Sequence, residues 1–171
     1  MNSENLRARQ APLKENFRTN PTAAKITLRS QGRLGEGITC RVETGRAMVE
    51  AGLHPATGGD GSAACSGDML LQALAACAGV TLQAVATALE IDLHGGTITA
   101  EGDLDFRGTL GVSKEVPVGF TAIRLRFDLQ TNASPEQIQS LQKLTERYCV
   151  VYQTLRQPPT MEFSIVPTRP V

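Results

Sequence analysis

The four cysteines of this 171-residue chain, Cys40, Cys65, Cys77 and Cys149, are its most chemically distinctive residues. Cys77 lies inside a long apolar stretch, and Cys149 ends a second helical pattern, so the two thiols sit on the helices expected to pack together. Such a pair can do redox chemistry: one thiolate attacks a peroxide oxygen, becomes a sulfenic acid, and is resolved by the second thiol as a disulfide. The alternative is that both are small core residues.

The other reactive patterns in the sequence are weak. There is no CxxC, which excludes a thioredoxin-like motif, and His54 and His94 have no cysteine or carboxylate at metal-ligand spacing. The glycines within 58–61 lack the GK[ST] of a phosphate-binding loop. We therefore expect no metal site. Cys40 alternates in phase with apolar neighbours and is expected in the core, whereas Cys65 is expected to be an exposed bystander.

The apolar stretch from Ser66 to Glu90 predicts a central helix. It is rich in Ala and Leu and contains no proline, and at 1.5 Å per residue it would be roughly 35 Å long. Ser66 is a good N-cap, and Asp68 puts a negative charge in the first turn. Because the stretch is apolar on nearly every side, we expect it to be buried. It is too short and too rich in Ala, Gly and Thr for a convincing membrane span.

A second helix is predicted to begin after Ser134, which is followed by Pro135 at the first helical position and Gln137 at the capping-box position. Its apolar stripe comprises Ile138, Leu141, Leu144 and Tyr148, with Lys143, Glu146 and Arg147 on other faces. Cys149 ends this helix, and 150–155 can form a short further helix before two prolines.

Period-two alternation predicts the strands, which are expected within 25–29, 38–43, 46–50, 98–106, 123–129 and 161–166. Glycine-rich turns are expected at 31–37 and 93–96, and Phe163 and Ile165 of the last strand should face inward. The order of elements indicates an α+β fold with antiparallel sheets packed on two helices. Residues 1–24 are polar and interrupted by two prolines, so we expect an arm with little structure of its own, able to lie across a partner subunit, followed by one domain over 25–171.

The composition excludes some classes of partner. The net charge is zero and tryptophan is absent, which argues against nucleic acid and against an anionic membrane surface. The N-terminus has no apolar segment of the kind a secretory signal needs, so a cytoplasmic location is expected.

Two stretches resemble a known family. The run 69–77, MLLQALAAC, resembles the helix motif of the OsmC/Ohr family, osmotically inducible protein C and organic hydroperoxide resistance protein, and 147–155, RYCVVYQTL, resembles its second cysteine motif. The resemblance implies an intertwined homodimer in which two small antiparallel sheets wrap two central helices, with active sites at the subunit interface. It implies Cys77 as peroxidatic thiol and Cys149 as resolving thiol. It also implies reduction of organic hydroperoxides without a bound cofactor, and recycling by a dithiol such as a lipoylated protein.

The chain departs from the hydroperoxidase branch of that family at two positions. Gly67 stands where the branch has a glutamate, and Asp68 is the nearest carboxylate, able to substitute only if the first helical turn is irregular. Val150 follows Cys149 where the family usually has proline.

A buried thiol also needs a neighbouring cation to ionise. Arg33 is the first candidate for that cation, with Arg41 and Arg46 behind it.

The sequence predicts an OsmC-like thiol peroxidase. Its pocket would be apolar, because a hydroperoxide is recognised mainly by desolvating its hydrocarbon part. The alternative is a non-catalytic protein that binds an apolar small molecule at the dimer interface, and a third reading is a dimeric structural protein whose cysteines only fill space.

Overall fold

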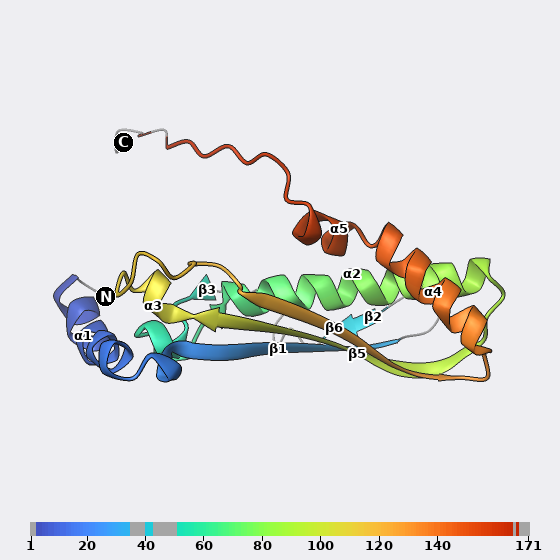
Figure 1. The fold of residues 1–171 in the computed structure, drawn as a ribbon, viewed down its shortest axis with the longest axis horizontal. Coiled ribbons are helices and arrows are strands. Elements are labelled where there is room, and N and C mark those ends of the chain that lie inside the picture. The colour runs from blue at the N-terminus through green and yellow to red at the C-terminus, as the bar shows by residue number, and fades with distance from the viewer. Residues whose placement is uncertain (1–2, 35–39, 43–50, 166, 168–171) are drawn as a thin grey trace.

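The computed structural model describes residues 3–34, 40–42, 51–165 and 167 (Figure 1). Their elements, in chain order, are α1 (Ser3–Thr19), η1 (Pro21–Ala24), β1 (Lys25–Leu34), β2 (Cys40–Val42), β3 (Ala51–Gly52), η2 (Pro55–Thr57), β4 (Ala64–Cys65), α2 (Ser66–Ala88), β5 (Leu93–Asp105), α3 (Phe106–Thr109), β6 (Ala122–Thr131), α4 (Pro135–Tyr148) and α5 (Val150–Arg156). The α+β class expected from the sequence is confirmed.

One antiparallel sheet forms the base of the molecule. Its strand order is β2-β1-β5-β6, and the central helix α2 lies lengthwise across one face (Figure 1). The second sheet is a parallel pair, β3 with β4, of two residues each, rather than the antiparallel sheet expected. The strand predicted over 46–50 lies outside the described residues, as does the Cys40 side chain.

The long strands run through positions where the sequence predicts turns. Gly95 and Gly96 of β5 pair with Gln130 and Leu129 of β6, after an irregularity at Leu93. Glycine at position 96 lets the backbones of β5 and β6 approach closely, because a Cβ there would lie 2.8 Å from the Asp128 carbonyl oxygen. The predicted turn at 31–37 is likewise strand as far as Leu34.

Alternation gives the sheet two different faces. Ile98 pairs with Phe127, and Ala100 with Leu125, so these side chains share one face, which we call the inner face. Ile98 and Ala100 are completely buried, and the inner face packs against α2. The intervening residues, including Asp103, form the outer face.

The prediction of a long central helix is confirmed, with a different cap and less burial than expected. Cys65 rather than Ser66 is the N-cap of α2, and Cys65 is half-buried rather than exposed. Met69, Leu70 and Val80 are exposed, because the sheet, α4 and α5 together cover only part of the surface of α2. Among the described residues α2 is the one helix long and apolar enough to qualify as a membrane span by length and composition, and half of its most apolar window is buried.

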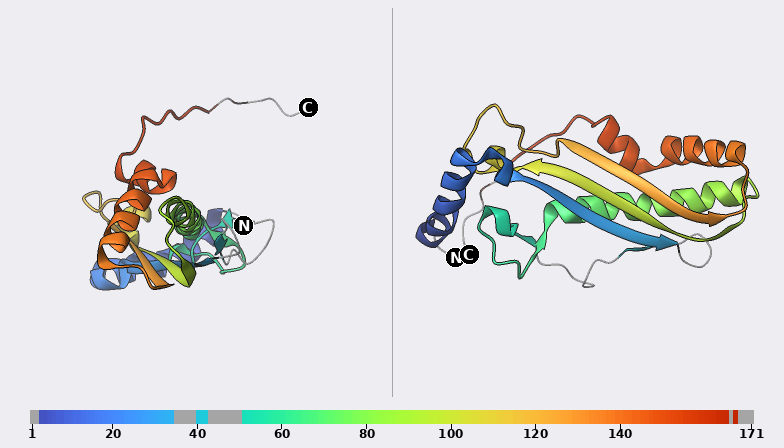
Figure 2. Two further views of the ribbon diagram at one scale, coloured as in Figure 1. Left: turned by 90° about the vertical axis from the view of Figure 1, so that its right-hand side faces the viewer. Right: turned by 60° about the horizontal axis from the view of Figure 1, so that its bottom comes forward.

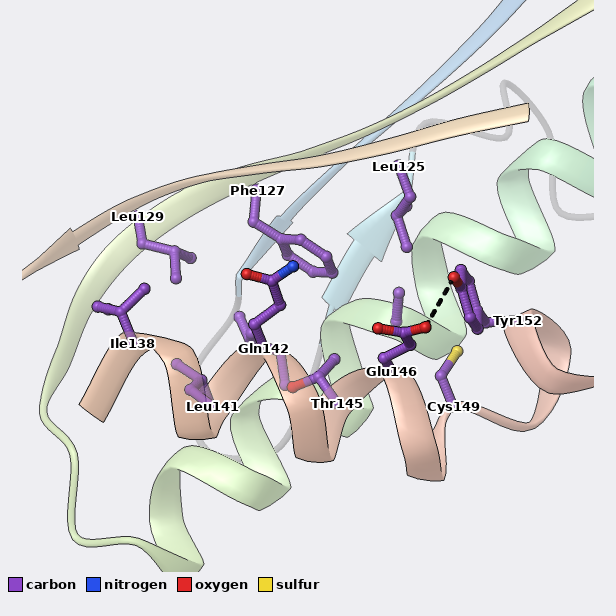
Figure 3. A pocket seen from close by; sticks show the side chains of 12 residues that line it. Leu125, Phe127, Leu129, Ile138, Leu141, Gln142, Thr145, Glu146, Cys149 and Tyr152 are labelled. Atoms are coloured by element: carbon purple, nitrogen blue, oxygen red, sulfur yellow. Dashed lines mark hydrogen bonds between the residues drawn. The ribbon is translucent and has the colours of Figure 1, made fainter. Parts of the chain in front are cut away.

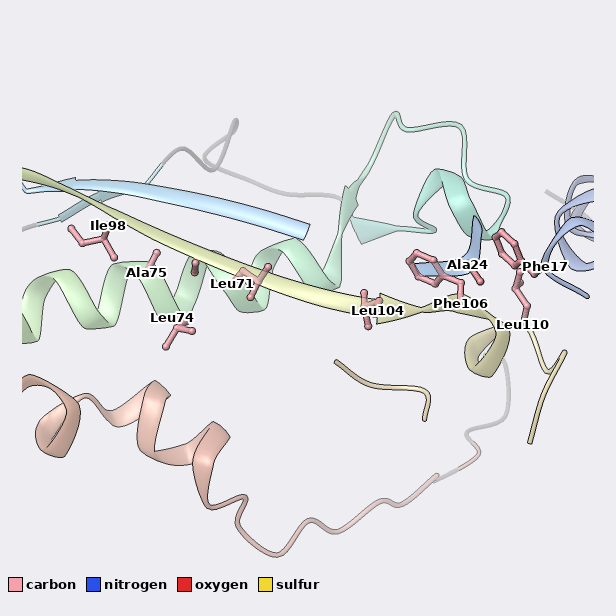
Figure 4. Close-up of a cluster of buried hydrophobic side chains, with 10 residues drawn as sticks. Phe17, Ala24, Leu71, Leu74, Ala75, Ile98, Leu104, Phe106 and Leu110 are labelled. Carbon is pink, nitrogen blue, oxygen red and sulfur yellow. The ribbon is translucent and has the colours of Figure 1, made fainter. Parts of the chain in front are cut away.

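The main core lies between α2 and the inner face. Leu71, Leu74 and Ala75 of α2 have at most 1% of their surface exposed and pack with Ile98 and Leu104 of β5 (Figure 4). The cluster continues past the sheet to the N-terminal elements.

The N-terminal region is more structured than expected. Its residues form the 17-residue helix α1 and a 3-10 turn, and Phe17 and Ala24 are buried in the main core with Phe106 and Leu110. The sequence hides this because the helix is polar overall, and its few apolar residues acquire a partner only through the distant segment around Phe106.

The helix α4 begins as predicted and ends in a sharp break. Ser134 and Gln137 form the reciprocal capping box, and Pro135 occupies the first turn. Cys149, with extended backbone angles, is both the C-cap of α4 and the N-cap of α5. Of the expected stripe, Leu141 is buried, but Tyr148 is 55% exposed.

The C-terminal segment does not form the strand predicted over 161–166 within its described residues. Residues 157–165 have no regular structure, and they lead away from the body of the protein (Figure 2). Phe163 is 91% exposed and Ile165 80%, so neither faces inward as predicted. None of the described strands pairs with this alternating segment.

Candidate functional site: a thiol pair beside an apolar pocket

The two cysteines singled out by the sequence meet where three helices come together. Cys77 is on α2, Cys149 is at the break between α4 and α5, and both of these helices contact α2. The two thiols are free rather than joined as a disulfide, and they lie close enough for the Cys77 thiol to affect the pKa of Cys149. The 72 residues that separate them in sequence are thus bridged by helix packing.

The two thiols have different surroundings. Cys149 is only 1% exposed, and burial, together with the neighbouring Cys77 thiol, raises the pKa of Cys149 to about 11. Backbone amides of Val151 and Tyr152 in the first turn of α5 act in the opposite direction, but they do not outweigh burial. Cys77 keeps part of its surface accessible. Cys149 therefore holds its proton at neutral pH, and Cys77 is the thiol that remains open to approach.

The position of Cys149 is fixed by the backbone on both sides. Its amide donates to the Thr145 carbonyl oxygen at 3.0 Å, ending α4, and its own carbonyl accepts from the Gln153 amide at 2.9 Å, starting α5. The side chain is thus held at a helix break, pointing toward α2.

An apolar pocket of about 320 Å³ ends at Cys149 (Figure 3). Its lining comes from α2, β6, α4 and α5: Ala78, Leu82, Leu125, Phe127, Leu129, Ile138, Leu141, Gln142, Thr145, Glu146, Cys149 and Tyr152. Thr145 is 3% exposed, and none of the described residues provides a hydrogen-bond partner for its Oγ1. An unpaired hydroxyl in a pocket wall is a group that an occupant could satisfy.

A polar cluster that sequence reasoning missed stands at the same end of the pocket. The Tyr152 hydroxyl donates to Glu146 Oε1 at 3.1 Å (Figure 3). Arg156 donates to the same oxygen at 2.8 Å. Burial and the Glu146 carboxylate raise the pKa of Tyr152. The sequence placed Glu146 on a polar face, because helical spacing carries no information across the break at Cys149.

Asp68 is not at the thiol pair. The helix α2 is regular from Ser66, so the nine residues between Asp68 and Cys77 span about 13 Å. Burial raises the pKa of Asp68, and the nearby His54 partly opposes that shift. The His54 ring in turn stacks on Phe106, with 5.1 Å between centroids.

Arg33 lies on the wrong side of the sheet to activate Cys77 within this chain. It pairs with Thr97, which neighbours the inner-facing Ile98, so alternation places Arg33 on the outer face, where it is exposed. The Arg41 side chain and the whole of Arg46 lie outside the described residues. The guanidinium that the described part of the chain holds near the pocket is that of Arg156.

Metal binding has no support in the described part of the chain, where no three His, Cys, Asp or Glu residues come together in a suitable group.

The comparisons with known proteins agree with this architecture. A solved structure of an OsmC-like hydroperoxide resistance protein from Jannaschia sp. CCS1 superimposes with a TM-score of 0.59 at 16% identity, covering 81% of this chain and 91% of that one. An OsmC-like protein from Mycoplasma pneumoniae gives a TM-score of 0.55 at 16% identity, covering 78% and 86%. No curated protein sequence matches the chain. Residues 59–164, which hold both cysteines and the helices that carry them, match the family described as OsmC-like protein, and the chain belongs to that family.

Proposed function

We propose that this protein is a thiol peroxidase that reduces organic hydroperoxides through Cys77 and Cys149. The observation that carries the proposal is a pair of neighbouring free thiols, of which Cys149 lines an apolar pocket. Membership of the OsmC-like family supports a role in hydroperoxide resistance in general terms. The pocket would desolvate the hydrocarbon part of the substrate.

The difference in exposure between the two thiols supports distinct roles for them in this proposal. The Cys77 thiolate attacks one peroxide oxygen, the O–O bond breaks, and the leaving alkoxide takes a proton, giving Cys77 sulfenic acid and an alcohol. The Cys149 sulfur then attacks the Cys77 sulfur, and the hydroxyl leaves as water with the Cys149 proton. A dithiol reductant, for example a lipoylated protein, reduces the disulfide. Each cycle converts one hydroperoxide and one dithiol into an alcohol, water and a disulfide.

Arg156 replaces Arg33 as our candidate for the positive charge near the site. It is held by Glu146 and lies one turn after Tyr152, whose backbone amide faces Cys149. Asp68 is left without a catalytic role in this proposal, because α2 keeps it away from the thiols.

We further propose that the working form is a homodimer located in the cytoplasm. Met69, Leu70 and Val80 of α2 are exposed apolar residues, and the apolar alternation of the C-terminal segment is unpaired within the described residues. A second copy that covers these surfaces would bury both. Analytical ultracentrifugation tests the dimer, and a monomer at micromolar concentration would rule it out.

Intact mass after one equivalent of cumene hydroperoxide tests the function. We expect a loss of two hydrogens that disappears in both Cys77→Ser and Cys149→Ser, with Cys149→Ser trapping a sulfenic acid that dimedone labels at Cys77. The matched control is Cys65→Ser, which changes the other described free thiol and should leave the mass change intact. An unchanged mass, or oxidation that depends on Cys65, would overturn the proposal.

The alternative is a protein that binds an apolar small molecule in the same pocket without turning it over. The unpaired Thr145 hydroxyl favours an occupant with a polar group among its apolar atoms. Retention of such a ligand by wild type and Cys77→Ser alike, with no peroxide consumed, would establish binding without catalysis.

A further inference from the structure

Two pockets adjoin each other between α2, β6 and α5. Next to the pocket that ends at Cys149 lies a second pocket of about 300 Å³, lined by residues of α2, β6, α5 and the segment just before β6, among them Leu74, Phe120 and Leu155. Among the residues that the structure describes, the two linings share only Leu125 and Tyr152. These two side chains therefore form the wall between the compartments, and Figure 3 shows both at the same end of the first pocket.

Tyr152 is held firmly in that wall. Its hydroxyl is tied to Glu146, which also accepts from Arg156, and the Gln153 side chain donates to the Glu146 carbonyl oxygen at 2.7 Å. The Tyr152 side chain packs against the main core cluster. Moving the ring aside would break a half-buried hydrogen bond and expose apolar surface, so the wall is a fixed part of the resting structure.

We propose that Tyr152 is the residue that sets the size of the hydrocarbon group this protein accepts. Compact branched or aromatic hydroperoxides fit the first pocket with the wall in place, whereas long unbranched ones need the second pocket as well. Small-molecule sites span about 300–1,000 Å³, so each compartment alone is at the small end of that range, and the two joined would lie in its middle. This inference rests on the proposed function, since it names the substrate class of the same pocket.

The test compares dodecyl hydroperoxide with cumene hydroperoxide in wild type and Tyr152→Ala, using the ratio of the two kcat/KM values. Tyr152→Ala opens the wall, and each additional buried methylene is worth roughly fourfold in affinity, so the dodecyl-to-cumene ratio should rise by at least about tenfold. Tyr152→Phe keeps the ring and loses only the hydrogen bond, so its ratio should change by less than about threefold.

The matched control is Leu155→Ala, which truncates a residue of the same helix that lines the second pocket alone. It enlarges that pocket without opening the wall, so its ratio should stay close to that of wild type. If Tyr152→Ala does not fold, Leu125→Ala removes the other half of the wall and should shift the ratio in the same direction. An unchanged ratio in the folded wall variants, or an equal rise in Leu155→Ala, would overturn the inference.

Binding of the unreactive alcohols separates this inference from the proposed function. Calorimetric titration with dodecan-1-ol and cumyl alcohol should show the same shift in relative affinity in Tyr152→Ala. If the alcohol affinities shift but wild type turns over neither hydroperoxide, the role of Tyr152 in setting ligand size is supported and the peroxidase function is rejected. If wild type turns over the hydroperoxides but the ratios are unchanged in both assays, the peroxidase function is supported and the role of Tyr152 is rejected.

Discussion

The two faces of the four-stranded sheet come from alternate residues of the same strands, yet they present opposite surroundings. On the inner face Ile98 and Ala100 are completely buried against α2. On the outer face Arg124 donates two hydrogen bonds to the Asp103 carboxylate, one of 2.9 Å, and its Nε lies 3.6 Å from a carboxylate oxygen of Glu101. The step from Ala100 to Glu101 thus moves a side chain from a fully buried position to one that is about one-third exposed.

The two sides of the sheet also shift pKa values in opposite directions and for different physical reasons. Burial raises the pKa of Cys149, on the side of the sheet where α2, α4 and α5 meet. Hydrogen bonds from Arg124 and Thr27 hold the pKa of Asp103 well below its usual range on the outer face. The first shift keeps a reactive group protonated in a water-poor site, and the second belongs to an exposed ion-pair network that solvent screens.

The largest expected effect is on the inner side. Leu71→Ala removes a completely buried side chain from the main core, so we expect the free energy of unfolding to fall by about 2–5 kcal/mol. Urea denaturation of the reduced protein measures it. The control is Leu53→Ala, the same truncation at a residue that is 42% exposed. An equally large fall in the free energy of unfolding in this control would contradict the assignment of Leu71 to the core and Leu53 to the surface.

Alkaline pH tests the environment of Cys149. Its pKa is about 11 in the folded protein against 9.0 for an ordinary thiol, so between pH 9 and 11 the unfolded chain releases a proton that the folded chain keeps. Stability should therefore fall across this window, by an amount on the order of 2 kcal/mol. Comparing the pH slopes of wild type and Cys149→Ala, both reduced, isolates this contribution. Identical slopes would mean that Cys149 is not desolvated.

The smallest expected effect is on the outer face. Asp103→Asn removes the carboxylate that accepts from Arg124, but the pair is exposed, with 48% and 35% of the two side chains accessible. We expect the melting temperature at neutral pH to change by less than about 3 °C, and the change to shrink further in high salt. A shift that matches Leu71→Ala would show that the outer face is covered in the working protein.

Sequence reasoning succeeded where the signal is local. The capping box at Ser134, the apolar run of α2 and the alternation of β5 and β6 are short-range patterns, and the structure contains all three. It failed where a segment depends on distant partners. Residues 1–24 looked unstructured because the site that buries Phe17 is built by residues more than eighty positions away, and 161–165 looked like a strand although no described strand pairs with it.

The candidate site shows the same contrast between local sequence signals and contacts with distant residues. The sequence by itself determined which two cysteines stand on helices, and the family motifs around them, because residue type and helical period are written along the chain. Only the tertiary structure decided that these thiols are neighbours, that Arg33 faces away from them, and that Glu146, Tyr152 and Arg156 gather beside the pocket. The physical reason is that a helix break changes the direction of every side chain that follows it, and a strand's register decides which face each of its side chains occupies. Packing between distant segments determines both the break and the register.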